Sequence, residues 1–187
     1  MPGHSQIKKQ TLHNSLAKAQ NNFDGIPASK FLFGCLLALL CFITNAKAQA
    51  GKIPPFTMVQ ANGRTFTSQS LPKDKPLVLI YFSPECEHCQ KLMNDLFKRV
   101  TDFNKASLVM ITYLSPETVK SFATTYQVNK YPNIFVGTEG TGFFLRNHYS
   151  IMNMPFTALY DKNGNLVTTF KDDVKLSDIT NRLALLK

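Results

Sequence analysis

Tryptophan is absent from the 187 residues, and cysteine occurs only four times. No segment of roughly 20–50 residues repeats itself, which argues against a solenoid or a propeller. Charged residues make up 18% of the chain and apolar residues 44%, so the chain has enough apolar surface to bury a core. We therefore expect one globular domain, and the length leaves room for a targeting segment.

Runs of basic residues interleaved with aromatic residues are also missing, although the formal net charge is +9. Residues 1–50 hold five lysines and one aspartate, whereas residues 51–187 hold 16 basic and 11 acidic residues of alternating sign. The domain itself is only moderately basic. We expect no nucleic-acid partner.

A continuous apolar run covers residues 31–43, after Lys30 and before the small residues Ala46, Ala48 and Ala50. This order is typical of a secretory signal peptide, which we assign to residues 1–50 with a long region ahead of the apolar run. Its 13 apolar residues would span about 20 Å as a helix, less than the roughly 30 Å core of a bilayer. We predict an exported, periplasmic domain. Membrane attachment follows only in the alternative, in which residues 31–46 form an uncleaved anchor at the outer face of the inner membrane.

Residues 51–187 show strand and helix patterns in alternation. Apolar runs and turn residues predict seven strands, at 56–59, 64–68, 77–82, 108–114, 134–137, 156–160 and 166–170. Helical spacing predicts three helices, at 86–104, from Ser115 to about Tyr126, and at 175–186, with a glycine-rich loop at 137–142. The order predicts an α/β domain with a central mixed β-sheet flanked by helices on both faces.

The most informative segment is Cys86-Glu87-His88-Cys89, which follows a predicted buried strand and opens a predicted helix. Free N–H groups at a helix N-terminus favour a thiolate, so we expect Cys86 to be the activated sulfur. Cys89 lies one turn further along and can close a disulfide with Cys86. The alternative is a zinc site, which would need two more ligands, and the domain offers only His88 and His148. We expect a redox pair, no metal site and no cofactor.

Three features together resemble the exported thiol-disulfide oxidoreductases of thioredoxin-like fold, in the redoxin or TlpA/ResA-like branch related to AhpC/TSA. They are the cysteine motif after a strand, Met154-Pro155, and the hairpin sequence at 158–167. The resemblance covers roughly residues 53–187. It implies a thioredoxin-like fold in which Pro155 follows a cis peptide bond and faces the disulfide. It also implies that the backbone of Met154 binds an extended substrate.

Two residues depart from the thioredoxin pattern. Glu85 stands where thioredoxins have a tryptophan, and Ile80 stands where they have a buried aspartate. Without that carboxylate, a buried Cys89 would lose its proton reluctantly.

Charges around Cys86 set the expected redox potential. His88, when protonated, stabilises a Cys86 thiolate, whereas the carboxylates of Glu85 and Glu87 destabilise it. Two carboxylates against a partly protonated imidazole predict a modest reductant.

The predicted function is thiol-disulfide exchange with exported proteins. Cys86 attacks, Cys89 resolves, and the partners are protein thiols and disulfides; we expect a monomer. One alternative is a peroxidase of the peroxiredoxin branch, in which Ser83 fits the expected position but Leu79 replaces a proline. Another is a non-enzymatic metal chaperone, for which His148 is the one candidate ligand.

Overall fold

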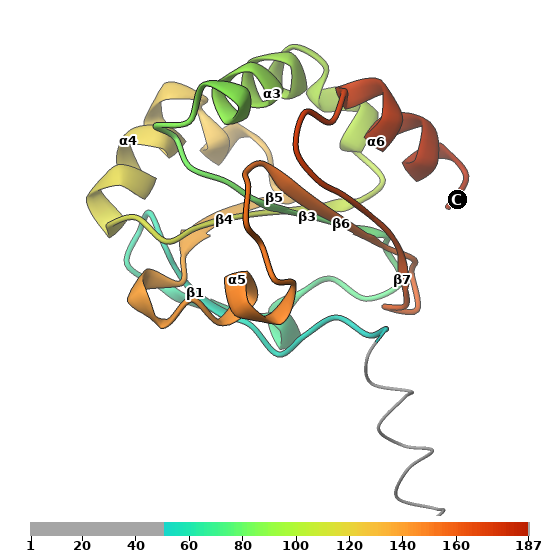
Figure 1. The fold of residues 1–187 in the computed structure, drawn as a ribbon, viewed down its shortest axis with the longest axis horizontal. Helices are drawn as coiled ribbons and strands as arrows, with labels where there is room; N and C mark the ends of the chain where they lie inside the picture. Colours follow the sequence, from blue (N-terminus) through green and yellow to red (C-terminus); the bar gives the residue numbers. More distant parts are fainter. Residues whose placement is uncertain (1–50, 187) are drawn as a thin grey trace, which may run out of the picture. The chain divides into compact units, whose positions relative to one another are not determined.

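A computed structural model describes residues 51–186 of the chain (Figure 1). The predicted signal peptide, residues 1–50, lies outside the described residues. Among the helices of residues 51–186, none combines the length and the apolar character needed to cross a membrane.

The described residues form one sheet of seven strands, in the order β2-β1-β5-β4-β3-β6-β7. Its three parallel strands are β3 (Leu77–Tyr81), β4 (Ser107–Thr112) and β5 (Ile134–Thr138). The antiparallel hairpins are β1 (Thr57–Gln60) with β2 (Thr65–Thr67), and β6 (Phe156–Tyr160) with β7 (Leu166–Phe170). The predicted mixed sheet and both predicted hairpins are confirmed.

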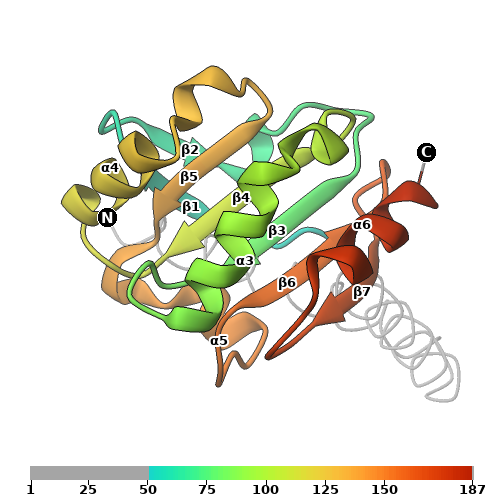
Figure 2. The same ribbon diagram turned by 90° about the horizontal axis from the view of Figure 1, so that it is seen from above.

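Helices cover both faces of the sheet, but unequally. Figures 1 and 2 show α3 (Glu87–Lys98), α4 (Pro116–Thr125) and α6 (Leu176–Ala184) on one face, with α5 (Phe144–His148) on the other. Each face has its own apolar cluster, one packed under the three longer helices and one packed with Leu145 of α5. Every side chain of β3 and β4 is therefore buried, which explains why both strands are almost continuously apolar.

The helix predicted for residues 86–104 is shorter in the structure. It ends at Lys98, and a separate 3-10 turn follows at Val100–Phe103. This turn buries the side chain of Phe103, and the Asn133 side chain donates to the carbonyl of Phe103 at 3.0 Å. Apolar spacing predicted the buried residue correctly, but it does not distinguish an α-helix from the tighter turn.

α4 begins as predicted. The Ser115 hydroxyl accepts a hydrogen bond from the Thr118 N–H at 3.3 Å, and Pro116 occupies the first turn. α5 was not predicted. It follows the glycine-rich loop, where the Glu139 carboxylate accepts from the Tyr81 hydroxyl and from the Leu145 N–H, each at 2.8 Å.

The pairing of β3 with β6 determines where the site forms. Tyr81, at the end of β3, is the register partner of Phe156, at the start of β6. The cysteine motif follows β3, and Met154-Pro155 precedes β6. Antiparallel pairing therefore brings together two segments that are 68 positions apart in the sequence.

Candidate active site

Cys86 is the residue that caps the N-terminus of α3. Its backbone is extended, with φ −90° and ψ 125°, while its carbonyl accepts the first helical hydrogen bond, from the Gln90 N–H at 2.9 Å. The Gln90 side chain donates back to the Pro84 carbonyl at 2.7 Å and so fixes the preceding loop. The Cys86 side chain is half-buried at the N-terminus of the helix, where the free backbone N–H groups carry a partial positive charge.

Cys89 lies one turn into α3 and is fully buried. It belongs to the apolar cluster that also contains Ile80, Phe82 and Leu92. Burial raises the pKa of the Cys89 thiol to about 12; a backbone hydrogen bond from Ser83 opposes this shift, and a hydrogen bond with Cys86 adds to it. The two cysteines therefore differ in exposure and in their surroundings.

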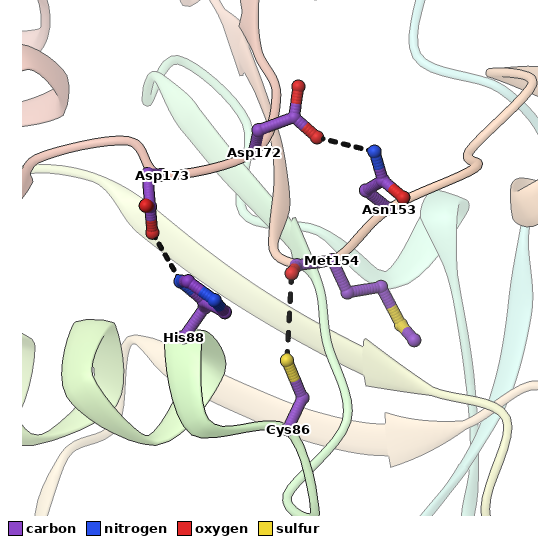
Figure 3. A network of polar contacts seen from close by, with 6 residues as sticks. All are labelled: Cys86, His88, Asn153, Met154, Asp172 and Asp173. Atoms are coloured by element: carbon purple, nitrogen blue, oxygen red, sulfur yellow. Dashed lines mark hydrogen bonds and ion pairs between the residues drawn. The ribbon is translucent and has the colours of Figure 1, made fainter.

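Met154 and Pro155 lie against the motif, as the resemblance implied. The peptide bond between them is cis. The Cys86 thiol donates to the Met154 carbonyl, with 3.6 Å between sulfur and oxygen (Figure 3). Pro155 is buried and Met154 is half-buried. The structure thus places the predicted docking residues directly beside the predicted nucleophile.

Glu85, Glu87 and His88 are all exposed around Cys86. Glu87 lies in the first turn of α3, so its carboxylate shares the helix N-terminus with the Cys86 sulfur. Figure 3 shows His88 pointing towards Asp173, and the His88 Nδ1 atom contacts the Asp173 carboxylate. Sequence reasoning did not find Asp173, which is 85 positions away and exposed.

Asp173 belongs to the connection between β7 and α6, residues 171–175. The neighbouring Asp172 accepts a hydrogen bond from the Asn153 side chain at 2.8 Å (Figure 3). One short connection therefore contacts both the motif helix and the residue that precedes Met154. Nothing in the sequence pattern marks these two aspartates, because both resemble ordinary exposed loop residues.

A surface hollow of about 520 Å³ opens between α3 and this connection. Its apolar lining includes Leu92, Pro155 and Val174, and His88 lies on it as well. Of the other apolar residues near the motif, Met93 and Phe156 are buried in the core, whereas Met152 is 84% exposed.

His148 lies apart from the cysteines. It is exposed on α5, where its ring packs against Phe144 and Tyr149, on the opposite face of the sheet from α3. No three His, Cys, Asp or Glu side chains within residues 51–186 are placed to hold a metal ion.

Comparison with known proteins places this arrangement in a family. The model of the AhpC/TSA family matches residues 50–185. The chain belongs to the AhpC/TSA family. No curated protein sequence matches it.

Solved structures with the same fold have low sequence identity to this AhpC/TSA protein. A secreted Mycobacterium tuberculosis disulfide oxidoreductase homologous to E. coli DsbE is 20% identical, with a TM-score of 0.59 over 71% of this chain and 96% of that chain. A thiol-disulfide oxidoreductase from Bacteroides fragilis is 15% identical, with a TM-score of 0.60 over 73% and 99%. A peroxiredoxin-like protein from Aquifex aeolicus is 12% identical, with a TM-score of 0.62 over 73% and 86%. The predicted thioredoxin-like fold is confirmed.

Proposed function

We propose that this AhpC/TSA protein is a thiol-disulfide oxidoreductase that exchanges dithiol and disulfide with exported proteins. The supporting observation is the inequality of the two sulfurs. Cys86 is half-buried at a helix N-terminus beside the Met154 carbonyl, whereas Cys89 is fully buried one turn away. One sulfur suits attack on a partner, and the other suits an intramolecular second step.

Each step of the exchange conserves atoms and electrons. The Cys86 thiolate attacks a substrate disulfide, forms a mixed disulfide and releases one substrate sulfur as a thiolate. Cys89 then loses its proton and attacks the Cys86 sulfur, which releases the second substrate sulfur and forms the Cys86–Cys89 disulfide. The substrate gains two electrons and the protein loses two; the reverse sequence oxidises a substrate dithiol.

Met154 supplies a backbone acceptor for the substrate. In the dithiol state its carbonyl accepts a hydrogen bond from the Cys86 thiol. Once Cys86 is joined to a substrate sulfur, that donor is gone and the carbonyl becomes available to a substrate N–H. An extended substrate segment can then lie across Met154 and Pro155, next to the hollow beside His88.

Export of the domain is part of the proposal. The apolar run at residues 31–43 and the small residues after it support a signal segment. Structures of similar fold include a pneumococcal exposed lipoprotein and the secreted Mycobacterium tuberculosis protein.

Redox potential is expected to respond to the charges around Cys86. Glu87→Gln removes a negative charge, stabilises the thiolate and should raise the potential, whereas His88→Ala should lower it. Each shift should be roughly 10–40 mV, since a tenfold change in the exchange equilibrium corresponds to about 30 mV. A glutathione redox titration measures both variants against wild type.

Glu117→Gln is the matched control for this titration, because Glu117 occupies the first turn of α4 and is also exposed. Its potential should equal that of wild type. A lower potential for Glu87→Gln would show that the carboxylates do not control the site.

A thiol peroxidase is the second candidate. Family membership, the peroxiredoxin-like structure from Aquifex aeolicus and the position of Ser83 favour it. However, Leu79 replaces the expected proline, and the buried Ser83 hydroxyl accepts a hydrogen bond from the Glu85 N–H at 3.2 Å.

Two rates measured on the same preparation separate these candidates. We expect the protein to accelerate reduction of insulin disulfides by dithiothreitol, and Cys86→Ala to abolish the acceleration. Consumption of hydrogen peroxide with a thiol donor should stay near the rate of an ordinary exposed thiol. Fast peroxide consumption without insulin reduction would instead establish the peroxidase.

A further inference from the structure

The resolving step requires a thiolate at a site that disfavours charge. Burial raises the pKa of Cys89 to about 12, and the backbone hydrogen bond from Ser83 is the largest contribution that lowers it. No carboxylate among the described residues contributes to this pKa. Ile80, on β3 below the motif, is fully buried and apolar. A Cys89 thiolate would therefore form with very few donors around it.

Two buried hydroxyls in residues 51–186 have no hydrogen-bond partner, and they belong to Thr157 and Ser107. A buried hydroxyl without a partner is unfavourable and calls for a physical reason. Ser107, at the start of β4, lines a surface hollow of about 490 Å³ at the opposite end of the sheet from the motif. Thr157 has no exposed surface at all and lies two residues after Pro155.

Sheet register places Thr157 on the same face as Cys89. Side chains alternate along β6, and Phe156, Ala158 and Tyr160 belong to the cluster on the α5 face. Thr157 therefore faces the α3 layer, where it is the direct cross-strand partner of Ile80. Cys89 and Ile80 share the apolar cluster of that layer. The unpartnered hydroxyl thus faces the layer of the molecule that contains Cys89.

We propose, given the exchange function above, that Thr157 supplies a hydrogen bond to the Cys89 sulfur when Cys89 resolves the mixed disulfide. The hydroxyl keeps its own proton throughout. The Cys89 proton passes to the departing substrate thiolate, the sulfur–sulfur bond to the substrate breaks, and the Cys86–Cys89 bond forms. In the dithiol structure the Thr157 hydroxyl has no hydrogen-bond partner, so its bond to the Cys89 sulfur forms only in this step.

The groups around Cys89 make the assignment testable by pH. Cys86 is the titratable group that faces it from α3. β3 and β6 contribute Ile80 and Thr157, and α6 contributes Leu176 and Ile179 to the same layer. None of these four titrates between about pH 6 and about pH 9. Glu85, Glu87 and His88 lie exposed around Cys86 and are the same in every variant, so the difference between the pH profiles of wild type and Thr157→Val reports on the Cys89 step.

Quenched-flow mass spectrometry of the reduced protein with oxidised glutathione measures the step. Attack by Cys86 gives a glutathione adduct, and attack by Cys89 removes it. Thr157→Val, which keeps the shape and deletes the hydroxyl, should slow removal of the adduct roughly 10- to 100-fold, the factor a hydrogen bond to a charged group is worth. The rate of adduct removal by Thr157→Val should reach the wild-type value only at a higher pH. Thr157→Ser should stay within about threefold of wild type.

Ser107→Ala is the matched control, because it deletes the other unpartnered buried hydroxyl far from the motif. It should leave adduct removal unchanged, and both deletions should leave the unfolding temperature equal or higher. Wild-type rates for Thr157→Val at every pH, or equal slowing by Thr157→Ser, would overturn the role of the hydroxyl. Failure of wild type itself to form the adduct would instead overturn the proposed function.

Discussion

Limiting iodoacetamide added to the reduced protein near neutral pH is expected to label Cys86 at least about 100-fold faster than Cys89. Cys86 is half-buried at the N-terminus of α3, whereas Cys89 has no exposed surface. Because burial raises the pKa of Cys89 to about 12, very few molecules carry a Cys89 thiolate near pH 7. Burial and the low fraction of thiolate therefore both protect Cys89 from the reagent. Peptide mapping by mass spectrometry measures the ratio.

Labelling in guanidinium is the control, since both thiols should then react at similar rates. Cys86→Ala provides a second control, because the folded variant should stay almost unlabelled. Faster labelling of Cys89 in the folded wild type would reverse the assigned roles of the two cysteines.

Cys89→Ala is expected to keep substrates attached to Cys86 roughly 100-fold longer or more, because the intramolecular attack that releases them is lost. The substitution removes only the small buried thiol group of Cys89, so the domain should still fold. Expression of this variant in the native cell, followed by non-reducing electrophoresis, should show mixed disulfides that disappear when dithiothreitol reduces them.

Cys86→Ala is the matched variant for this trap. It retains Cys89 and the fold, but it lacks the sulfur that attacks the substrate. It should therefore accumulate no mixed disulfides. Equal trapping by the two variants would show that Cys89 reaches substrates on its own, which its burial argues against. The proteins captured by Cys89→Ala would also identify the substrate class.

Much of the fold follows from local patterns. β3 and β4 are buried on both faces, and that burial requires the apolar runs from which they were predicted. The β6–β7 hairpin was predicted from the turn residues at 161–164; in the structure the Asp161 side chain accepts hydrogen bonds from the backbone N–H groups of Asn163 and Asn165. The cysteine pair was predicted because its position between a strand and a helix is visible in the sequence.

Other parts of the site depend on contacts between distant residues. The His88–Asp173 contact joins two exposed side chains from separate parts of the chain. No sequence pattern around either residue predicts the contact. Thr157 becomes notable only through its register with Ile80, which the pairing of β3 with β6 creates. The end of α3 at Lys98 depends on how Phe103 enters the core. Each case requires the tertiary structure.

The most direct test of the proposed redox pair is a glutathione titration of wild type with peptide mapping at each point. The structure predicts a single two-electron transition between the dithiol and an intramolecular Cys86–Cys89 disulfide. Its midpoint should be well below the roughly −120 mV of DsbA. A Cys86 that stays glutathionylated while Cys89 remains a free thiol throughout would contradict the account.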